Sequence, residues 1–195
     1  MLCLAGFAQA TAPRILVLGD SISAGYGMSL EQSWVSLMAA HLSGSEPPVE
    51  VINASISGET SAGGLRRLPR LLAEHKPSLV VIELGANDGL RGFPLAGLRL
   101  NLQRLVSLSQ NAGARVILVG MEIPPNYGSR YTAGFRESFT AIADQTDSTL
   151  VPFLLDGIAT DPALMQADGI HPTADAQPLL LKNILPTIQS VLANL

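Results

Sequence analysis

The sequence predicts an α/β fold in which helices cover both faces of an open parallel β-sheet. Three observations support this prediction. Short apolar segments typical of strands alternate along the chain with longer segments of helical periodicity. Several of the strand segments are almost wholly apolar, as expected for parallel strands that are buried on both faces. The connections between them are short, so each strand leads through one helix to the next strand.

The predicted sheet has about five strands. The first is the apolar segment at residues 15–18, and the later ones span residues 49–53, 79–84, 116–119 and 149–152. The segments between them predict helices over residues 33–43, 61–75, 95–112 and 131–146, followed by a last helix over 173–193. Pro172 stands before this last helix, and Thr173 is suited to cap it. The helical rhythm is clearest in the third of these segments, where one face gathers Leu98, Leu102, Leu105 and Val106.

The composition indicates one globular domain. The 195 residues suffice for a sizeable core, and 47 % of them are apolar whereas only 14 % are charged. A net charge of −4 excludes the basic surface that nucleic-acid binding needs, and the longest apolar runs are too short to span a membrane. Cys3 is the single cysteine, and metal-ligand spacing is missing among His41, His75 and His171. We therefore predict that the protein has no metal site and no disulfide; we also expect a monomer, although these observations do not determine the oligomeric state.

The N-terminal segment MLCLAGFAQA is small and apolar and ends in Ala8-Gln9-Ala10, a pattern typical of signal-peptide cleavage sites. The basic stretch that begins such peptides is missing. We predict that residues 1–10 are the remnant of a signal peptide and that residues 11–195 form the single domain. The mature protein is then expected in the periplasm or outside the cell.

Polar residues and glycines follow the predicted strands, where the carboxyl ends of parallel strands form the ligand-binding edge of such sheets. Asp20 and Ser21 follow the first strand, and Gly58 lies in the loop after the second. The third strand leads into GAND at residues 85–88, and DGIH at residues 168–171 stands before the last helix. These distant segments are therefore predicted to meet at one edge of the sheet.

Ser21 and His171 are residue types that nucleophilic catalysis requires. A serine hydroxyl becomes a good nucleophile when a base takes its proton, and a neutral histidine supplies that base near pH 7. Asp168 stands three residues before His171, so a turn can fold its carboxylate back onto the imidazole Nδ1. Taken alone, Ser21 is more typical of a helix N-cap, so the catalytic prediction depends on the other residues. We expect Asp20 and Asp88 to brace their loops rather than to react.

Three kinds of donor are available to stabilise an oxyanion near Ser21. A helix that begins at Ser21 would present its first backbone amides without partners. Gly58 offers a backbone N–H that no side chain shields, and Asn87 offers a side-chain amide from the third strand end. All three groups come from loops that are predicted to share one edge.

Four segments resemble the sequence blocks of the SGNH (GDSL-type) hydrolases: GDSIS at residues 19–23, Gly58 within NASISGET, GAND at 85–88 and DGIH at 168–171. The resemblance runs from about Arg14 to the last helix. Longer stretches, among them ELGANDGLRGF, PPNYGSRY and DGIHPTADAQP, are similar to the bacterial periplasmic thioesterase I, lysophospholipase and arylesterase subfamily. Two positions depart from the pattern. Ile22 replaces leucine at equal volume, and Ala86 replaces a glycine, which is expected to stiffen the loop 85–93 and leaves the acyl preference open.

The resemblance implies a flavodoxin-like three-layer α/β/α sandwich and a set of site residues. Ser21 would be the nucleophile, His171 the base and Asp168 its orienting acid. The oxyanion hole would consist of the Ser21 amide, the Gly58 amide and the Asn87 side chain. The implied substrates are acyl esters and thioesters such as acyl-CoA, lysophospholipids and aryl esters, and no metal or organic cofactor is implied. We therefore predict a serine esterase or thioesterase that works through an acyl-enzyme on Ser21 and contacts lipid substrates.

Apolar residues in the loops after the third and fourth strands predict a groove for the acyl chain. They are Leu90, Phe93, Ile123, Pro124 and Tyr127. Ordinary loop packing is the alternative interpretation of the same residues. Two other functions also stay open: a carbohydrate acetylesterase, which would need a short polar pocket, and a non-catalytic flavodoxin-like binding module, which an organophosphonate ester would not label.

Overall fold

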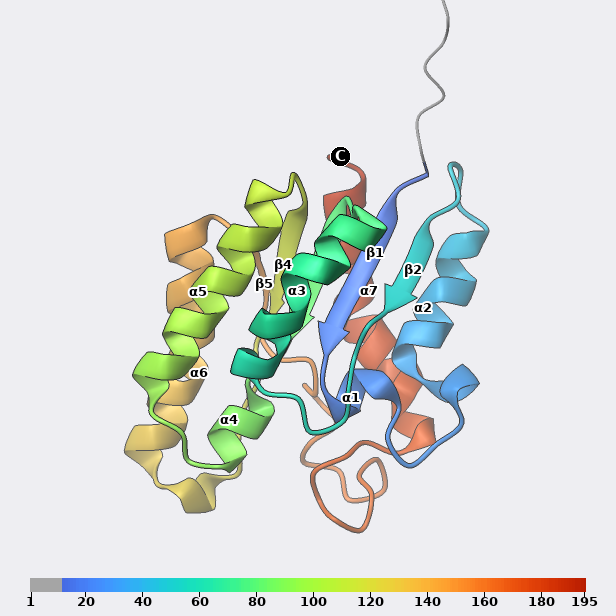
Figure 1. Ribbon diagram of the computed structural model, residues 1–195. Coiled ribbons are helices and arrows are strands. Elements are labelled where there is room, and N and C mark those ends of the chain that lie inside the picture. The colour runs from blue at the N-terminus through green and yellow to red at the C-terminus, as the bar shows by residue number, and fades with distance from the viewer. Residues whose placement is uncertain (1–11) are drawn as a thin grey trace, which may run out of the picture.

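The central sheet contains five parallel strands, which confirms the predicted fold class. The computed structural model describes residues 12–195. The strands lie in the order β2-β1-β3-β4-β5 (Figure 1). Their bounds are Arg14–Gly19 for β1, Glu50–Asn53 for β2, Leu79–Glu83 for β3, Arg115–Val119 for β4 and Thr149–Val151 for β5. Each end lies within one residue of its prediction, because buried parallel strands are marked by continuous apolar runs.

The helices form a layer on each face of the sheet (Figure 1). One face is covered by α3 (Ser61–His75), α5 (Leu95–Asn111) and α6 (Ser129–Thr146), and the other by α2 (Trp34–Ser43) and α7 (Gln177–Leu192). The predicted apolar face of α5 is buried, as are the residues of β1 from Ile15 to Leu18. Within residues 12–195, no helix is both long enough and apolar enough to cross a membrane.

The structure also contains several helices of three to five residues, which are too brief to show a period in the sequence. They are α1 (Ser21–Ala24), η1 (Leu30–Gln32), α4 (Ala86–Leu90), η2 (Pro125–Tyr127) and η3 (Ala174–Ala176). The last of these interrupts the start of the predicted helix 173–193, so that α7 begins only at Gln177. Thr173 precedes η3, but its side chain does not make the predicted capping bond. The Thr173 hydroxyl donates to the Leu164 carbonyl instead. The predicted signal-peptide remnant lies outside the described residues.

The carboxyl ends of the strands share the lower edge of the sheet in Figure 1, because all neighbouring pairs are parallel. At this edge β1 leads into α1 and β3 leads into α4. The long segment between β5 and α7 also passes beneath this edge. The topology therefore brings segments from both ends of the chain to one place.

Candidate active site

Ser21 is the first residue of α1, and only Asp20 separates it from the end of β1, in a tight turn at residues 19–25 that we call the Ser21 turn. The carboxylate of Asp20 caps the helix by accepting from the Ile22 amide at 3.1 Å. This bond is the brace to a backbone amide that the sequence predicted. The helix ends after one turn at Gly25, whose φ of 72° lies in the left-handed region that glycine adopts without strain.

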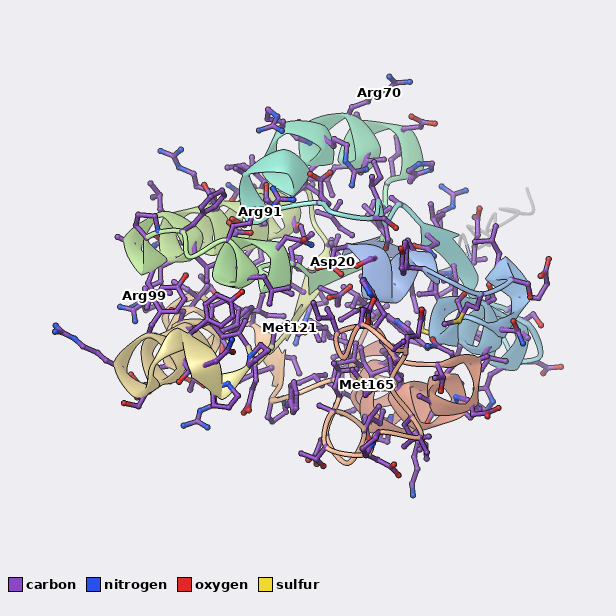
Figure 2. The ribbon with its side chains drawn as sticks, turned by 90° about the horizontal axis from the view of Figure 1, so that it is seen from below. Asp20, Arg70, Arg91, Arg99, Met121 and Met165 are labelled. Atoms are coloured by element: carbon purple, nitrogen blue, oxygen red, sulfur yellow. The ribbon has the colours of Figure 1, made fainter. Side chains whose placement is uncertain are left out.

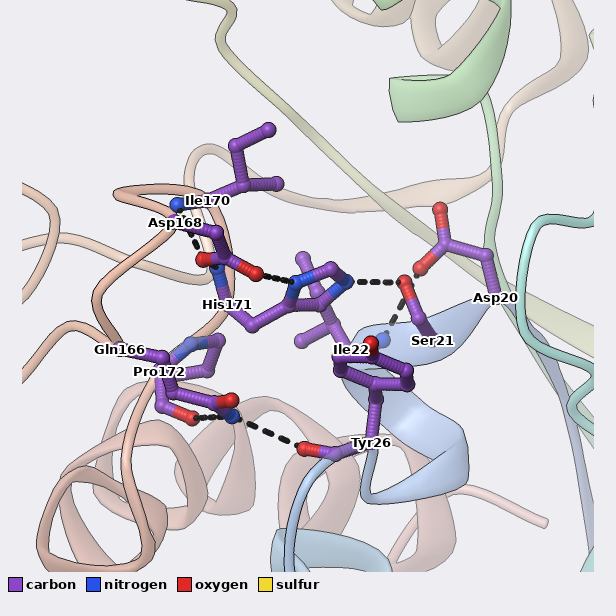
Figure 3. Close-up of polar contacts among 9 residues, drawn as sticks. All are labelled: Asp20, Ser21, Ile22, Tyr26, Gln166, Asp168, Ile170, His171 and Pro172. Atoms are coloured by element: carbon purple, nitrogen blue, oxygen red, sulfur yellow. Dashed lines mark hydrogen bonds and ion pairs between the residues drawn. The ribbon is translucent and has the colours of Figure 1, made fainter.

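Asp168 and His171 occupy the segment at residues 164–173, which we call the His171 loop. One oxygen of Asp168 accepts from the Ile170 amide at 2.9 Å and from the His171 amide at 3.0 Å. Its other oxygen lies 2.6 Å from Nδ1 of His171. On the far side of the ring, Nε2 lies 2.8 Å from Oγ of Ser21 (Figure 3). The structure therefore brings together the three residues that the sequence predicted to meet.

The electrostatics of Asp168 fix the roles of the two ring nitrogens. Hydrogen bonds from the His171 amide, the His171 ring and the Ile170 amide lower the pKa of Asp168 to about 2. The carboxylate is therefore ionised near neutral pH and accepts the proton on Nδ1. This tautomer leaves the lone pair of Nε2 directed at the Ser21 hydroxyl, so the arrangement is able to accept a proton from the serine.

Of the predicted oxyanion donors, the Asn87 side chain contacts the Ser21 turn, and the loop that contains Gly58 is hydrogen-bonded to this turn. Asn87 belongs to α4, and its Nδ2 donates to Asp20 at 3.1 Å. Gly58 lies in the loop between β2 and α3, with a φ of 77°. The Ile56 amide ties this loop to the Ser21 turn by donating to the Gly19 carbonyl at 3.1 Å. The contact between Asp20 and the Asn87 amide was not predicted, and it shows that Asp20 braces a second loop as well as its own.

A second buried acid, Glu83 at the end of β3, lies behind the Ser21 turn. Its carboxyl group accepts from the Ser23 hydroxyl at 2.6 Å and from the Asp20 amide at 3.2 Å. Burial raises the pKa of Asp20 to about 6, and burial together with the neighbouring Asp20 charge raises the pKa of Glu83 well above its ordinary value. Sequence reasoning missed Glu83, although an acid in an otherwise apolar strand was a signal for a buried polar role.

Asp88 also braces its loop, as the sequence predicted. Its carboxylate accepts from the amide and from the hydroxyl of Ser61 at the start of α3.

An apolar cavity of about 340 Å³ opens beside the Ser21 turn. Its walls include Ile22 and Ile170, the chain neighbours of Ser21 and His171, and also Ala86. Figure 2 looks onto this edge and shows Asp20 near its centre, with Met121 and Met165, two further lining residues, below it in that view.

Three of the five residues predicted for an acyl groove line this cavity, namely Leu90, Ile123 and Pro124. Phe93 and Tyr127, the other two predicted groove residues, are not among the residues that line this cavity. Phe93 is 44 % exposed, and the hydroxyl of Tyr127 donates to the Leu90 carbonyl at 2.8 Å. Sequence periodicity reveals neither the exposure of Phe93 nor the hydrogen bond of Tyr127.

A family model described as the GDSL-like Lipase/Acylhydrolase family matches residues 17–178. The chain belongs to this family. Among curated relatives of this GDSL-like acylhydrolase, Esterase TesA of Pseudomonas aeruginosa is 52 % identical over 184 residues, which are 94 % of this chain and 92 % of TesA. Thioesterase 1/protease 1/lysophospholipase L1 of Escherichia coli is 42 % identical over 92 % of this chain and 85 % of its own.

A solved structure of similar shape is the psychrotrophic esterase EstA from Pseudoalteromonas sp., inhibited by monoethylphosphonate. It matches with a TM-score of 0.88 and 47 % identity and covers 92 % of this chain and 98 % of its own. These findings confirm the predicted family and the prediction of an esterase or thioesterase. The protein is therefore an ester hydrolase and not a non-catalytic binding module.

Proposed function

We propose that Ser21 is the nucleophile of this GDSL-like acylhydrolase, with His171 as its base and Asp168 as the orienting acid. The observation that carries the proposal is the unbroken chain of contacts from Asp168 through both ring nitrogens to the serine, with distances of 2.6 and 2.8 Å. As the Ser21 Oγ attacks the acyl carbonyl, Nε2 takes its proton. The imidazolium then gives this proton to the leaving alcohol or thiol, and water attacks the acyl-enzyme by the same route.

The tetrahedral intermediate carries its negative charge on the former carbonyl oxygen. We assign its stabilisation to the amides of Ser21 and Gly58 and to the Asn87 side chain. The Asn87 amide has a second hydrogen besides the one that it gives to Asp20, and this hydrogen is available for the oxyanion. Donors of this kind act without reorganisation because the surrounding loops hold them in place.

The acyl chain of the substrate is proposed to lie in the apolar cavity beside Ile22 and Ile170. Its lining is rich in aliphatic and methionine side chains, which favours an acyl ester or thioester over an acetylated carbohydrate. Each methylene buried there would contribute up to about 0.8 kcal/mol to binding. Acyl-CoA, lysophospholipids and aryl esters are the substrates that we propose, in keeping with relatives that are named arylesterase, thioesterase and lysophospholipase.

Labelling with an organophosphonate p-nitrophenyl ester, followed by peptide mass spectrometry, tests the role of Ser21. The wild type and the control Ser190→Ala, an exposed serine of α7, are expected to gain the phosphonyl mass on the Ser21 peptide. Ser21→Ala is expected to gain none and to lose hydrolysis of p-nitrophenyl acetate. A wild type that hydrolyses esters without labelling at Ser21 would contradict the proposal.

Rates on p-nitrophenyl esters of increasing chain length, beside acyl-CoA thioesters, test the substrate class. A preference for acetate over all longer chains would favour the carbohydrate acetylesterase.

We also propose that the protein is exported after cleavage following Ala10, with residues 11–195 as its single domain. The Ala8-Gln9-Ala10 pattern supports this proposal. Mass spectrometry of the exported protein tests this cleavage, and sedimentation tests the predicted monomer.

A further inference from the structure

Gln166 lies in the His171 loop, and its side chain makes hydrogen bonds both within this loop and to the residue that follows the Ser21 turn (Figure 3). Its backbone amide donates to the His171 carbonyl at 2.7 Å. Its side-chain Nε2 donates to the Pro172 carbonyl at 3.0 Å and to the Tyr26 carbonyl at 2.9 Å. Tyr26 follows the Ser21 turn directly, and 140 residues separate it from Gln166. One amide group therefore ties the main chain beside His171 to the main chain beside Ser21.

Tyr26 also contacts the imidazole itself. The centroid of its ring lies 4.4 Å from that of His171, with an angle of 37° between the planes. The Gln166 side chain also fits closely against Gly27, the residue after Tyr26. A Cβ atom on Gly27 would lie only 2.5 Å from Oε1 of Gln166. The carbonyl and the ring of Tyr26 are thus held against the His171 loop by a well-packed contact.

The His171 loop needs such a tie for a geometric reason. The bonds between Asp168 and His171 lie within the loop, so they orient the ring but do not set its distance from Ser21. The contact between His171 and Ser21 crosses the gap, but proton transfer must break it in every turnover. Among the side-chain hydrogen bonds of residues 12–195, the one from Gln166 to Tyr26 is the other bond that joins the His171 loop to the Ser21 turn or to the two residues that follow this turn.

We propose that Gln166 is a positioning residue that holds His171 at its working distance from Ser21 through the Tyr26 and Pro172 carbonyls. The proposal rests on the roles proposed above for Ser21 and His171. Gln166 touches neither reacting atom, so its removal should leave substrate binding intact and slow the chemical steps. A misplacement of about 1 Å in such a site typically costs about a hundredfold in rate.

The first test replaces Gln166 by leucine, which is of similar size and removes both side-chain hydrogen bonds. With p-nitrophenyl acetate, whose acyl group is too short to depend on the apolar cavity, we expect kcat to fall about ten- to a hundredfold and KM to stay within about twofold. The second-order rate of inactivation by an organophosphonate ester should fall by a similar factor. A merely structural contact would change the melting temperature without changing kcat of the folded enzyme.

Asn183 of α7 supplies a matched control. Its Nδ2 donates to the Leu154 carbonyl and to the Asp156 carbonyl, both at 2.9 Å, so Asn183→Leu removes two bonds of the same type. We expect this variant to lose stability but to keep kcat and the inactivation rate. An equal loss of kcat in both variants, or no loss in Gln166→Leu, would overturn the proposal.

Gln166→Glu provides a second variant should the leucine variant fail to fold. It keeps the size of the side chain but turns a carboxylate oxygen toward two carbonyl oxygens, so we expect the same selective fall in kcat. Wild-type kcat in Gln166→Glu would overturn the inference about Gln166 while leaving the proposed function untouched. A wild type that the phosphonate does not label would instead overturn the proposed function.

Discussion

The Nε2 atom of His171 lies 2.8 Å from the Oγ atom of Ser21, although 150 residues separate them in the chain. The parallel sheet explains this proximity. Ser21 lies just after β1, at the carboxyl edge of the sheet. The segment that follows β5 contains His171 and crosses the same edge before α7 begins. The contact is thus a consequence of topology, and its chemistry depends on what each loop adds around it.

The exchange Asp168→Asn tests whether the carboxylate sets the tautomer of His171. An amide in this place can donate to Nδ1, which would put the ring proton on Nε2 and remove the acceptor for the serine proton. We expect kcat on p-nitrophenyl acetate to fall about a thousand- to ten-thousand-fold. Circular dichroism would check the fold. The exposed Asp175 of η3 offers a control, since Asp175→Asn should keep full activity; comparable losses in both variants would contradict the assignment.

The contact of Asp20 with Asn87 predicts that Asp20 acts on catalysis through the oxyanion donor. The Ile22 amide donates to Oδ1 of Asp20 and the Asn87 amide to Oδ2, so an asparagine at position 20, which has an NH2 group in place of one of these oxygens, keeps an acceptor for only one of the two donors. We expect kcat to fall about tenfold to a hundredfold in Asp20→Asn and about a hundred- to a thousandfold in Asn87→Ala.

A double-mutant cycle distinguishes this role from a general effect on the Ser21 turn. If Asp20 acts by holding Asn87, then adding Asp20→Asn to Asn87→Ala should cost little further rate, because the group that it positions is already gone. Purely additive losses in kcat would show that the two residues act independently and would remove this explanation.

The sequence was sufficient to predict the fold and the central contact for identifiable reasons. Buried parallel strands appear as continuous apolar runs, and the rule that ligands bind at their carboxyl ends placed Ser21, Asn87 and His171 at one edge. Local patterns carried both conclusions. Asp168 stands only three positions before His171, so the pairing of the two residues can be recognised without tertiary information.

Contacts between distant polar residues could not be predicted in the same way. Glu83 meets Asp20 because β3 pairs with β1 in a register that places Gly19 opposite Glu83. Gln166 reaches Tyr26 across 140 residues, and a glutamine in a loop has no sequence signal of its own. Phe93 and Tyr127 belong to the expected loops, but the direction of their side chains depends on packing. Such features require coordinates.

The raised pKa of Asp20 predicts that its burial opposes stability at neutral pH. The folded state binds this proton more tightly than the unfolded state, so the stabilisation is present below about pH 4 and is lost as the pH rises through about 6. The loss amounts to on the order of 3 kcal/mol for a shift from 3.8 to about 6. The raised pKa of Glu83 acts in the same direction, whereas Asp168 acts oppositely and only below about pH 4.

Urea unfolding of the wild type and of Asp20→Asn at pH 4 and at pH 7.5 measures this effect. Because Asp168 and the surface groups titrate in both proteins, the difference between the two unfolding free energies reports Asp20 together with the part of the Glu83 pKa shift that the Asp20 charge causes, and both act in the same direction. We expect this difference to move in favour of the variant as the pH rises. A difference that stays constant with pH would show that Asp20 has an ordinary pKa in the folded protein.

The placement of Ile123 inside the cavity and of Phe93 outside it predicts different effects of truncating each. Ile123→Ala would lengthen the space beside the Ser21 turn, so we expect the optimum of kcat/KM on p-nitrophenyl esters to move to longer chains, with roughly a fourfold gain for each added methylene that becomes buried. Phe93→Ala removes a side chain that is 44 % exposed and absent from the cavity wall, so the chain-length profile should stay in place. The two alanine variants thus serve as controls for each other, because both shorten an apolar side chain in a loop at the same edge of the sheet. A shifted profile in Phe93→Ala with an unchanged one in Ile123→Ala would place the acyl chain over the outer surface of the loop 85–93 and not in the cavity.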